Sequence, residues 1–97
     1  MKNLVFSPRA QVDLDEIWVY TANHWDIGQA DFYVRGIVDA CLAVARGSRI
    51  GRNADDIRPG YSKITIVSHV VFYKESALEI DVVRVLHQRM DLPAHLD

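Results

Sequence analysis

The sequence cannot form an internal disulfide, because Cys41 is its only cysteine. A reducing cytosol is therefore the expected compartment. No apolar run approaches the roughly 20 residues that a membrane-spanning helix needs. We also expect no signal peptide, because Met1 leads directly into a segment with the pattern of folded structure. The sequence thus predicts a cytoplasmic protein without a membrane partner.

The chain also lacks a large net charge of either sign. The chain has 11 Lys and Arg residues against 13 Asp and Glu, a formal net charge of -2. Proteins that hold nucleic acid by bulk electrostatics present a strongly basic face, so we expect no direct binding of that kind. The four histidines lack the close spacing of a zinc site, and the glycines are too scattered for a phosphate loop. The sequence predicts neither a metal nor a cofactor.

Hydrophobic residues make up 49% of the 97 residues, which is enough for one core, so we expect a single domain over residues 1–97. Ser7 and Pro8 favour a helix start, because serine caps free N–H groups and proline loses no hydrogen bond at the first helical position. Apolar spacing predicts helices over residues 8–24 and 29–46. Their stripes contain Ala10, Leu14, Ile17, Thr21 and Trp25 in the first helix, and Ala30, Val34, Ile37, Cys41 and Val44 in the second. Val12, Trp18, Val19 and Tyr20 add a second, partly exposed apolar edge to the first helix.

The short connection between the helices predicts an antiparallel hairpin. Residues 3–6 form an apolar strand, and residues 61–67, 69–74 and 79–87 have the composition and alternation of strands. The order is therefore β-α-α-β-β-β. The sequence predicts an α+β fold, in which the helical hairpin packs on one face of a small, mostly antiparallel sheet. The other face also carries apolar side chains, which favours a partner that covers it.

Two tryptophans, Trp18 and Trp25, lie seven residues apart and share a helix face. We expect core packing for at least one of them. A partly exposed Trp18 would instead anchor a partner, because buried aromatic side chains dominate interface energetics. Three carboxylates early in the same helix, Asp13, Asp15 and Glu16, are interpreted as solvated side chains that match the helix dipole.

Two segments near the end of the chain carry a family resemblance. Residues 68–73 read Ser-His-Val-Val-Phe-Tyr, and residues 84–91 read Arg-Val-Leu-His-Gln-Arg-Met-Asp. The start at residues 7–10, the acidic turn at 13–17 and a Gly-Tyr pair at 60–61 accompany them. Together with the order of elements, these segments resemble the ParE branch of the ParE/RelE toxin superfamily over nearly the whole chain.

The resemblance implies a cytosolic bacterial toxin of a type II toxin–antitoxin system. Such a toxin inhibits DNA gyrase by binding, has no catalytic centre and is neutralised by a ParD-like antitoxin. RelE-like relatives are instead ribosome-dependent mRNA ribonucleases, and the fold does not decide between the two. ParE-like chains often carry basic residues at both positions after the Gly-Tyr pair, whereas this chain has Ser62 and then Lys63. A degenerate toxin that retains only antitoxin binding, and an unrelated binding module, are further alternatives.

The densest basic stretch follows the second helix. The disordered segment of a ParD-like antitoxin folds as it wraps the toxin, and a basic surface would speed the encounter with an acidic segment. The predicted antitoxin contacts are Trp18, Arg49, Arg52, Arg58, Tyr61 and Lys63. The C-terminal region of ParE-like toxins is linked to toxicity, so the tail at residues 88–97 and the end of the last strand become the target surface. The predicted target contacts are His87, Arg89, Met90 and His95.

The ribonuclease alternative needs a general base, a general acid and a cationic clamp close together. His87 is the candidate acid or base, and Arg84 is the candidate clamp. Alternation along the last strand places these two side chains on opposite faces of the sheet. In addition, Val70 occupies the position where the ribonuclease relatives often carry a catalytic arginine. We therefore predict no catalytic residues.

Overall fold

The computed structural model describes residues 1–96, and Asp97, the last residue of the predicted domain and tail, lies outside the described residues. The elements are β1 (Asn3–Phe6), α1 (Pro8–His24), α2 (Ile27–Arg46), β2 (Arg52–Asn53), β3 (Ser62–Ile66), β4 (His69–Glu75), β5 (Glu79–His87) and α3 (Leu92–His95). The predicted α+β fold is confirmed. None of the described helices is long and apolar enough to cross a membrane.

Side-chain caps and one glycine set the limits of the two long helices. Ser7 caps α1, because its Oγ accepts a hydrogen bond from the backbone N–H of Ala10 at 3.0 Å. Helix α2 begins slightly earlier than predicted, because Asp26 Oδ1 accepts from the N–H of Gln29 at 2.7 Å. Gly47 follows α2 with a φ of 80°, a left-handed conformation that costs glycine little.

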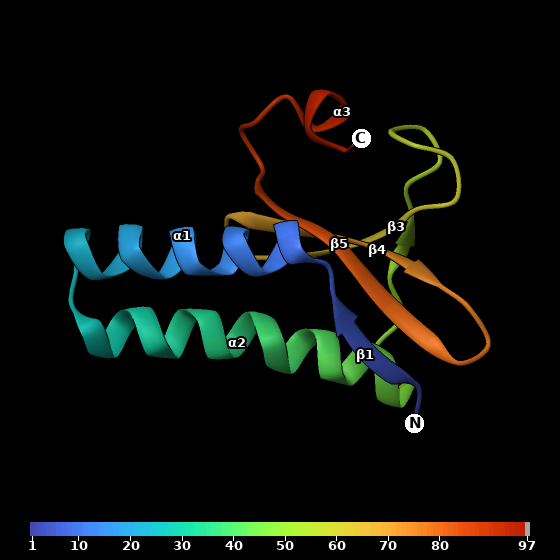
Figure 1. Ribbon diagram of the computed structural model, residues 1–97, viewed down its shortest axis with the longest axis horizontal. Helices are drawn as coiled ribbons and strands as arrows, with labels where there is room; N and C mark the ends of the chain where they lie inside the picture. Colours follow the sequence, from blue (N-terminus) through green and yellow to red (C-terminus); the bar gives the residue numbers. More distant parts are fainter. Residues whose placement is uncertain (97) are drawn as a thin grey trace.

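Five strands form one sheet in the order β1-β5-β4-β3-β2. Strand β1 is parallel to β5 and the other neighbours are antiparallel, which confirms the mostly antiparallel prediction. The α1–α2 hairpin covers one face (Figure 1). The core between them contains Ala10, Ile17, Ile37, Cys41, Val44, Val71, Ile80, Val82 and Val85. The two residues of β2 lie within the predicted loop and are too few to give a sequence pattern.

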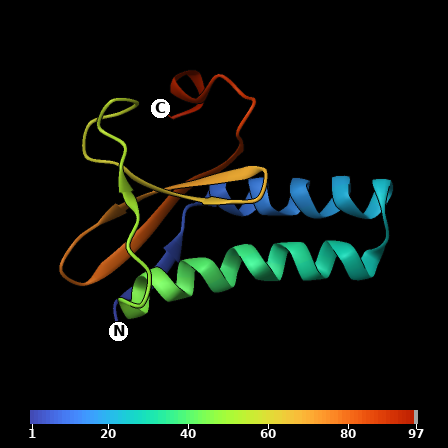
Figure 2. The same cartoon turned by 180° about the vertical axis from the view of Figure 1, so that it is seen from behind.

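The opposite face of the sheet is covered by the chain itself, which corrects the expectation of a partner there. A second apolar cluster contains Ala54, Tyr61, Val70, Phe72, Leu86 and Leu96, with Ile57, Val83 and Leu92 packed against it. The loop from residue 54 to 61 and the C-terminal tail supply the outer layer of this cluster. Figures 1 and 2 show both segments on the side of the sheet away from α2.

A bulge in β5 breaks the predicted alternation. Phe72 of β4 pairs with Arg84, but the next residue, Tyr73, pairs with Val82, so Val83 is an extra residue in the ladder. An extra residue reverses which face each following side chain occupies. Val82 and Val85 therefore both lie in the core under the helices, although the alternation of the sequence places them on opposite faces.

The second cluster makes the tail part of the folded core, and Leu96 is its test. Leu96 is 1% exposed, so we expect Leu96→Ala to lower the free energy of unfolding by about 2–5 kcal/mol, measured by urea denaturation. Leu78→Ala is the matched control, because Leu78 is 74% exposed and should change stability by less than about 0.5 kcal/mol. Equal effects of the two substitutions would contradict a packed tail.

Candidate functional site: a pocket between α1, β5 and the tail

Beyond Val82, β5 has no strand on its β1 side within the described residues, because β1 pairs with it only that far. The start of α1 satisfies this free edge. The N–H of Ser7 donates to the Val82 carbonyl at 2.9 Å, and the Ser7 hydroxyl donates to the Val83 carbonyl at 2.8 Å. Nearly two turns further along, the Asp13 carboxylate accepts from the backbone N–H of Val85 at 3.0 Å. The edge is thus closed by the capping residue Ser7 and by the Asp13 side chain of α1.

Asp13 and Arg84 form a buried, bidentate ion pair. Arg84 Nε and Nη2 donate to the two Asp13 oxygens at 2.8 and 2.9 Å, and the Asp13 side chain is only 5% exposed. Hydrogen bonding to Asp13 raises the pKa of Arg84 above its usual value. The third donor group, Arg84 Nη1, binds the His95 carbonyl of the tail at 2.7 Å. The interpretation of Asp13 as a solvated carboxylate is therefore wrong.

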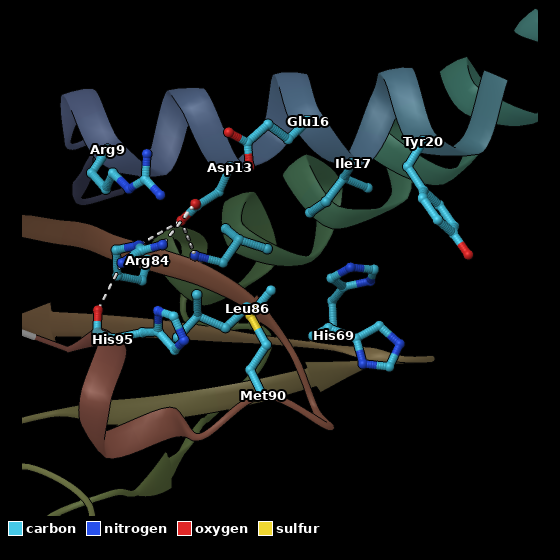
Figure 3. Close-up of a pocket in the computed structure, with 12 residues that line it drawn as sticks. Arg9, Asp13, Glu16, Ile17, Tyr20, His69, Arg84, Leu86, Met90 and His95 are labelled. Atoms are coloured by element: carbon cyan, nitrogen blue, oxygen red, sulfur yellow. Dashed lines mark hydrogen bonds and ion pairs between the residues drawn. The ribbon is translucent and has the colours of Figure 1, made fainter. Parts of the chain in front are cut away.

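A pocket of about 450 Å³ lies beside this pair, between α1 and the tail. It is lined by Arg9, Asp13, Glu16, Ile17, Tyr20, His69, Arg84, Val85, Leu86, His87, Met90 and His95. Figure 3 shows the α1 side chains above the pocket and the tail residues below it. The pairing of β5 with β4 is regular from Arg84 to His87, so these two side chains leave the strand on opposite faces, as predicted. Both nevertheless line this pocket, because Arg84 reaches around the free edge of β5 to Asp13 of α1.

Two histidines on neighbouring strands line the pocket. His69 and His87 are directly opposite each other on β4 and β5, with ring centroids 5.2 Å apart. The Tyr33 hydroxyl donates to the Ile66 carbonyl at 3.2 Å, so we assign its oxygen as acceptor for His69 Nδ1 at 2.6 Å. Burial, with a smaller contribution from the charge of His87, lowers the pKa of His69 to about 4. His69 is therefore neutral at pH 7, with a lone pair on Nε2.

Of the four predicted target contacts, His87, Met90 and His95 line the pocket. Arg89 does not line it, but its backbone N–H donates to His87 Nδ1 at 3.1 Å and its side chain is exposed. A neutral His87 consequently carries its proton on Nε2. The pocket thus holds a ring nitrogen that accepts and another that donates, which is an arrangement suited to polar recognition.

The six predicted antitoxin contacts fall in four places. Arg49, Arg52 and Lys63 line one groove at the β2–β3 edge, where Arg49 also donates to the Thr65 carbonyl at 3.1 Å. Arg58 donates to the Pro93 carbonyl at 3.3 Å and thereby contacts the tail. Tyr61 is buried in the second cluster, where its side chain supports the fold, and its role as an antitoxin contact stays a prediction.

Trp18, the sixth residue, lies at the junction of the two long helices. Its Nε1 donates to Asp31 Oδ1 of α2 at 2.8 Å, and its side chain is partly exposed. Trp25 is 74% exposed. Neither tryptophan belongs to an apolar cluster of the described residues, so the expectation of core packing for one of them is wrong. A role of Trp18 in partner binding stays a prediction.

Sequence reasoning missed Arg9, Glu16, Tyr20 and His69 as pocket residues. Arg9, Glu16 and Tyr20 follow the spacing of one side of a helix, but only the path of the tail shows that this side faces a pocket. For His69, the signal was its position opposite His87 in adjoining strands. Within residues 1–96, no group of three or more His, Cys, Asp or Glu side chains is arranged to hold a metal ion.

Comparisons with known proteins agree with this architecture. The family described as "ParE toxin of type II toxin-antitoxin system, parDE" matches residues 4–92. Toxin ParE1 of Mycobacterium tuberculosis strain H37Rv is 47% identical over 93 residues, which is 95% of each chain. Toxin ParE1 of Caulobacter vibrioides strain CB 15 is 38% identical over 96 residues, which is 99% of each chain.

A solved structure described as "Chromosomal ParDE TA system from P. aeruginosa" has the same fold, with a TM-score of 0.77 at 21% identity. The match covers 90% of this chain and 96% of that chain. Fold and sequence together place the protein among the toxins of type II toxin–antitoxin systems. Within that class, the chain belongs to the ParE toxin family.

The buried Asp13–Arg84 pair predicts a large loss of stability when one partner is removed. Asp13→Ala leaves a largely buried guanidinium and a backbone N–H without their acceptor, so the free energy of unfolding should fall by about 3–5 kcal/mol, measured by urea denaturation. Asp15→Ala is the matched control, because Asp15 is an exposed carboxylate in the same helix; it should cost less than about 0.5 kcal/mol. A comparable loss for both substitutions would contradict the structural role of Asp13.

The low pKa of His69 predicts a loss of stability in acid. Between pH 6.5 and about pH 4 the unfolded chain binds a proton on His69 that the folded chain does not, so the free energy of unfolding falls, by at most about 3 kcal/mol. His69→Gln should remove this part of the pH dependence in urea titrations, and the His69 ring should titrate near pH 4 by NMR. A His69 ring that titrates near pH 6.5 would refute the assignment.

Proposed function

We propose that this ParE toxin inhibits DNA gyrase by binding, without catalysis, and that a ParD-like antitoxin neutralises it in the cytoplasm. Family membership supports the toxin assignment. The observation that favours binding over catalysis is the engagement of Arg84 on all three of its nitrogen atoms. A guanidinium that clamps a phosphate needs a free fork of donors.

The ribonuclease alternative is weakened by the same contacts. His69 and His87 offer a neutral acceptor and a donor within one pocket, which is a favourable feature for acid–base chemistry. The candidate clamp, however, is already neutralised by Asp13 and tied to the tail. Freeing Arg84 for a scissile phosphate would leave Asp13 buried and unpaired, at a cost of several kcal/mol.

The proposed target surface is the pocket rim and the adjoining tail. Met90 and His95 lie on the tail side, and His87 lies at the strand end. Arg89 is exposed next to them, so its guanidinium is available for a carboxylate or a phosphate of the target. The thioether of Met90 can contact apolar protein surface, and the imidazoles and the Arg89 cation can contact polar groups or phosphates. This combination suits a target that is a protein–DNA complex, such as gyrase on DNA.

The proposed antitoxin surface includes the groove at the β2–β3 edge. Arg49, Arg52 and Lys63 bring three positive charges to this groove. Strand β2 covers only Ser62 and Lys63 of β3, and beyond them Arg49 occupies the Thr65 carbonyl. An added strand on this edge would take the place of that side-chain contact. An acidic, extended segment of the antitoxin matches both the charge and the hydrogen-bonding pattern of this edge.

A paired assay tests the function. The purified chain is incubated with gyrase, supercoiled DNA and ATP, and in parallel with translating ribosomes and mRNA. We expect linear DNA after protein digestion, and intact mRNA. Arg89→Glu should weaken the gyrase effect about tenfold or more, while Arg35→Glu, a charge reversal on an exposed residue of α2, should not. Cut mRNA with unaffected gyrase would replace the proposal with the ribonuclease alternative.

Two further experiments test neutralisation by the antitoxin and the alternative of a degenerate toxin. Added ParD-like antitoxin should restore gyrase activity, and the double variant Arg49→Glu and Arg52→Glu should need about tenfold more antitoxin, corresponding to about 1.4 kcal/mol. Inactivity in both assays, with antitoxin binding retained, would indicate a degenerate toxin. Recovery of activity by Ser62→Arg would then link that loss to the missing basic residue.

A further inference from the structure

The pocket between α1, β5 and the tail has the character of a site for a small, flat group. Its volume of about 450 Å³ lies within the range of small-molecule sites, which are mostly apolar with a few placed polar groups. Val85 and Leu86 supply apolar wall, and Met90 adds a thioether on the tail side. In Figure 3, Tyr20 extends from α1 toward the part of the pocket that His69 occupies.

The two histidines of the pocket offer an acceptor and a donor to a ligand. Nδ1 of His69 is engaged by the Tyr33 hydroxyl, and Nδ1 of His87 by the N–H of Arg89. Neither Nε2 atom has a hydrogen-bond partner within residues 1–96. Nε2 of the neutral His69 presents a lone pair, whereas Nε2 of His87 carries a proton in either of its charge states. The ring centroids are 5.2 Å apart, so one flat ligand can meet both rings.

This pair of groups matches the Watson–Crick edge of a nucleobase. Every nucleobase has an N–H donor beside an N or O acceptor on that edge, and proteins read an unpaired base there while apolar or aromatic side chains cover its faces. His69 would accept from the base N–H, and His87 would donate to the neighbouring acceptor. The carboxamide of an Asn or Gln side chain offers the same two groups, but it lacks the flat ring that the apolar wall would cover.

Two arginines are placed for the phosphates of a nucleic acid strand. Arg9 lines the pocket at the start of α1, and Arg89 is exposed beside His87. Neither forms a salt bridge within the described residues, so both guanidinium groups can bind phosphate oxygens. Two cations are too few for binding by bulk electrostatics, which agrees with the net charge of -2. Selection of the ligand therefore falls to the pocket.

We infer that this pocket binds one unpaired nucleobase of the DNA on which gyrase acts, with His69 and His87 on its Watson–Crick edge. The inference rests on the proposed function and names what the pocket recognises in the target. Pairing hides this edge, so recognition requires a base outside the duplex. Because every base carries an adjacent donor and acceptor, we expect tolerance of sequence.

The first experiment titrates the purified toxin with thymidine and follows the ring signals of His69 and His87 by NMR. A single nucleoside makes few contacts, so we expect a dissociation constant of about 0.1–1 mM and shifts of both rings. N3-methylthymidine has no N–H to donate and should bind about tenfold more weakly. This comparison needs no protein variant. Ring signals that stay in place well above that concentration range, or equal binding of the two nucleosides, would overturn the inference.

Ring-preserving variants test the two histidines directly. His69→Phe and His87→Phe keep an aromatic ring but remove Nε2, and each should weaken thymidine binding about fivefold or more. His24→Phe is the matched control, because His24 is exposed and does not line the pocket; it should leave the affinity unchanged. Equal affinity of the three variants would contradict the inference. If a variant does not fold, as checked by urea denaturation, the methylated nucleoside decides.

Oligonucleotides identify the source of the base. A short thymidine strand should bind more tightly than thymidine, because Arg9 and Arg89 reach its phosphates, and the same strand in a duplex should leave both rings unshifted. A clear preference for a uridine strand would make RNA the source and overturn the inference, as would N-acetylglutaminamide binding as well as thymidine. Thymidine binding with unaffected gyrase would refute the proposed function, whereas inhibited gyrase without thymidine binding would refute the base pocket alone.

Discussion

The buried carboxylate of Asp13 is the contact on which the site depends. It accepts hydrogen bonds from Arg84 and from the backbone of Val85. It thereby joins α1 to the part of β5 that has no partner on the β1 side. Because Arg84 also binds the His95 carbonyl, the same charge fixes the tail. Replacing a buried ion pair with apolar residues is often neutral for stability, whereas removing one partner is costly. We therefore interpret this pair as a device that specifies how three segments meet.

The pocket follows from an interrupted sheet. Strand β1 leaves β5 at Val82, and the extra residue Val83 changes the facing of the side chains beyond it. These two irregularities allow Arg84 to reach α1 while His87 stays paired with His69. A regular β5 with a full-length β1 beside it would satisfy its own edge and leave no need for Asp13. The site is thus a consequence of where regular structure stops.

The predictable parts of the structure are those with local causes. Ser7 and Gly47 set helix ends through their own chemistry, and apolar periodicity located the hairpin and the three long strands. The role of Asp13 was not predictable, because its partners lie some 70 residues away in sequence. The bulge at Val83 and the burial of Leu96 have no local signature either. For Trp25 a local pattern gave a wrong prediction. Its spacing fits the core stripe of α1, but the helix ends at His24 and the Trp25 side chain is exposed.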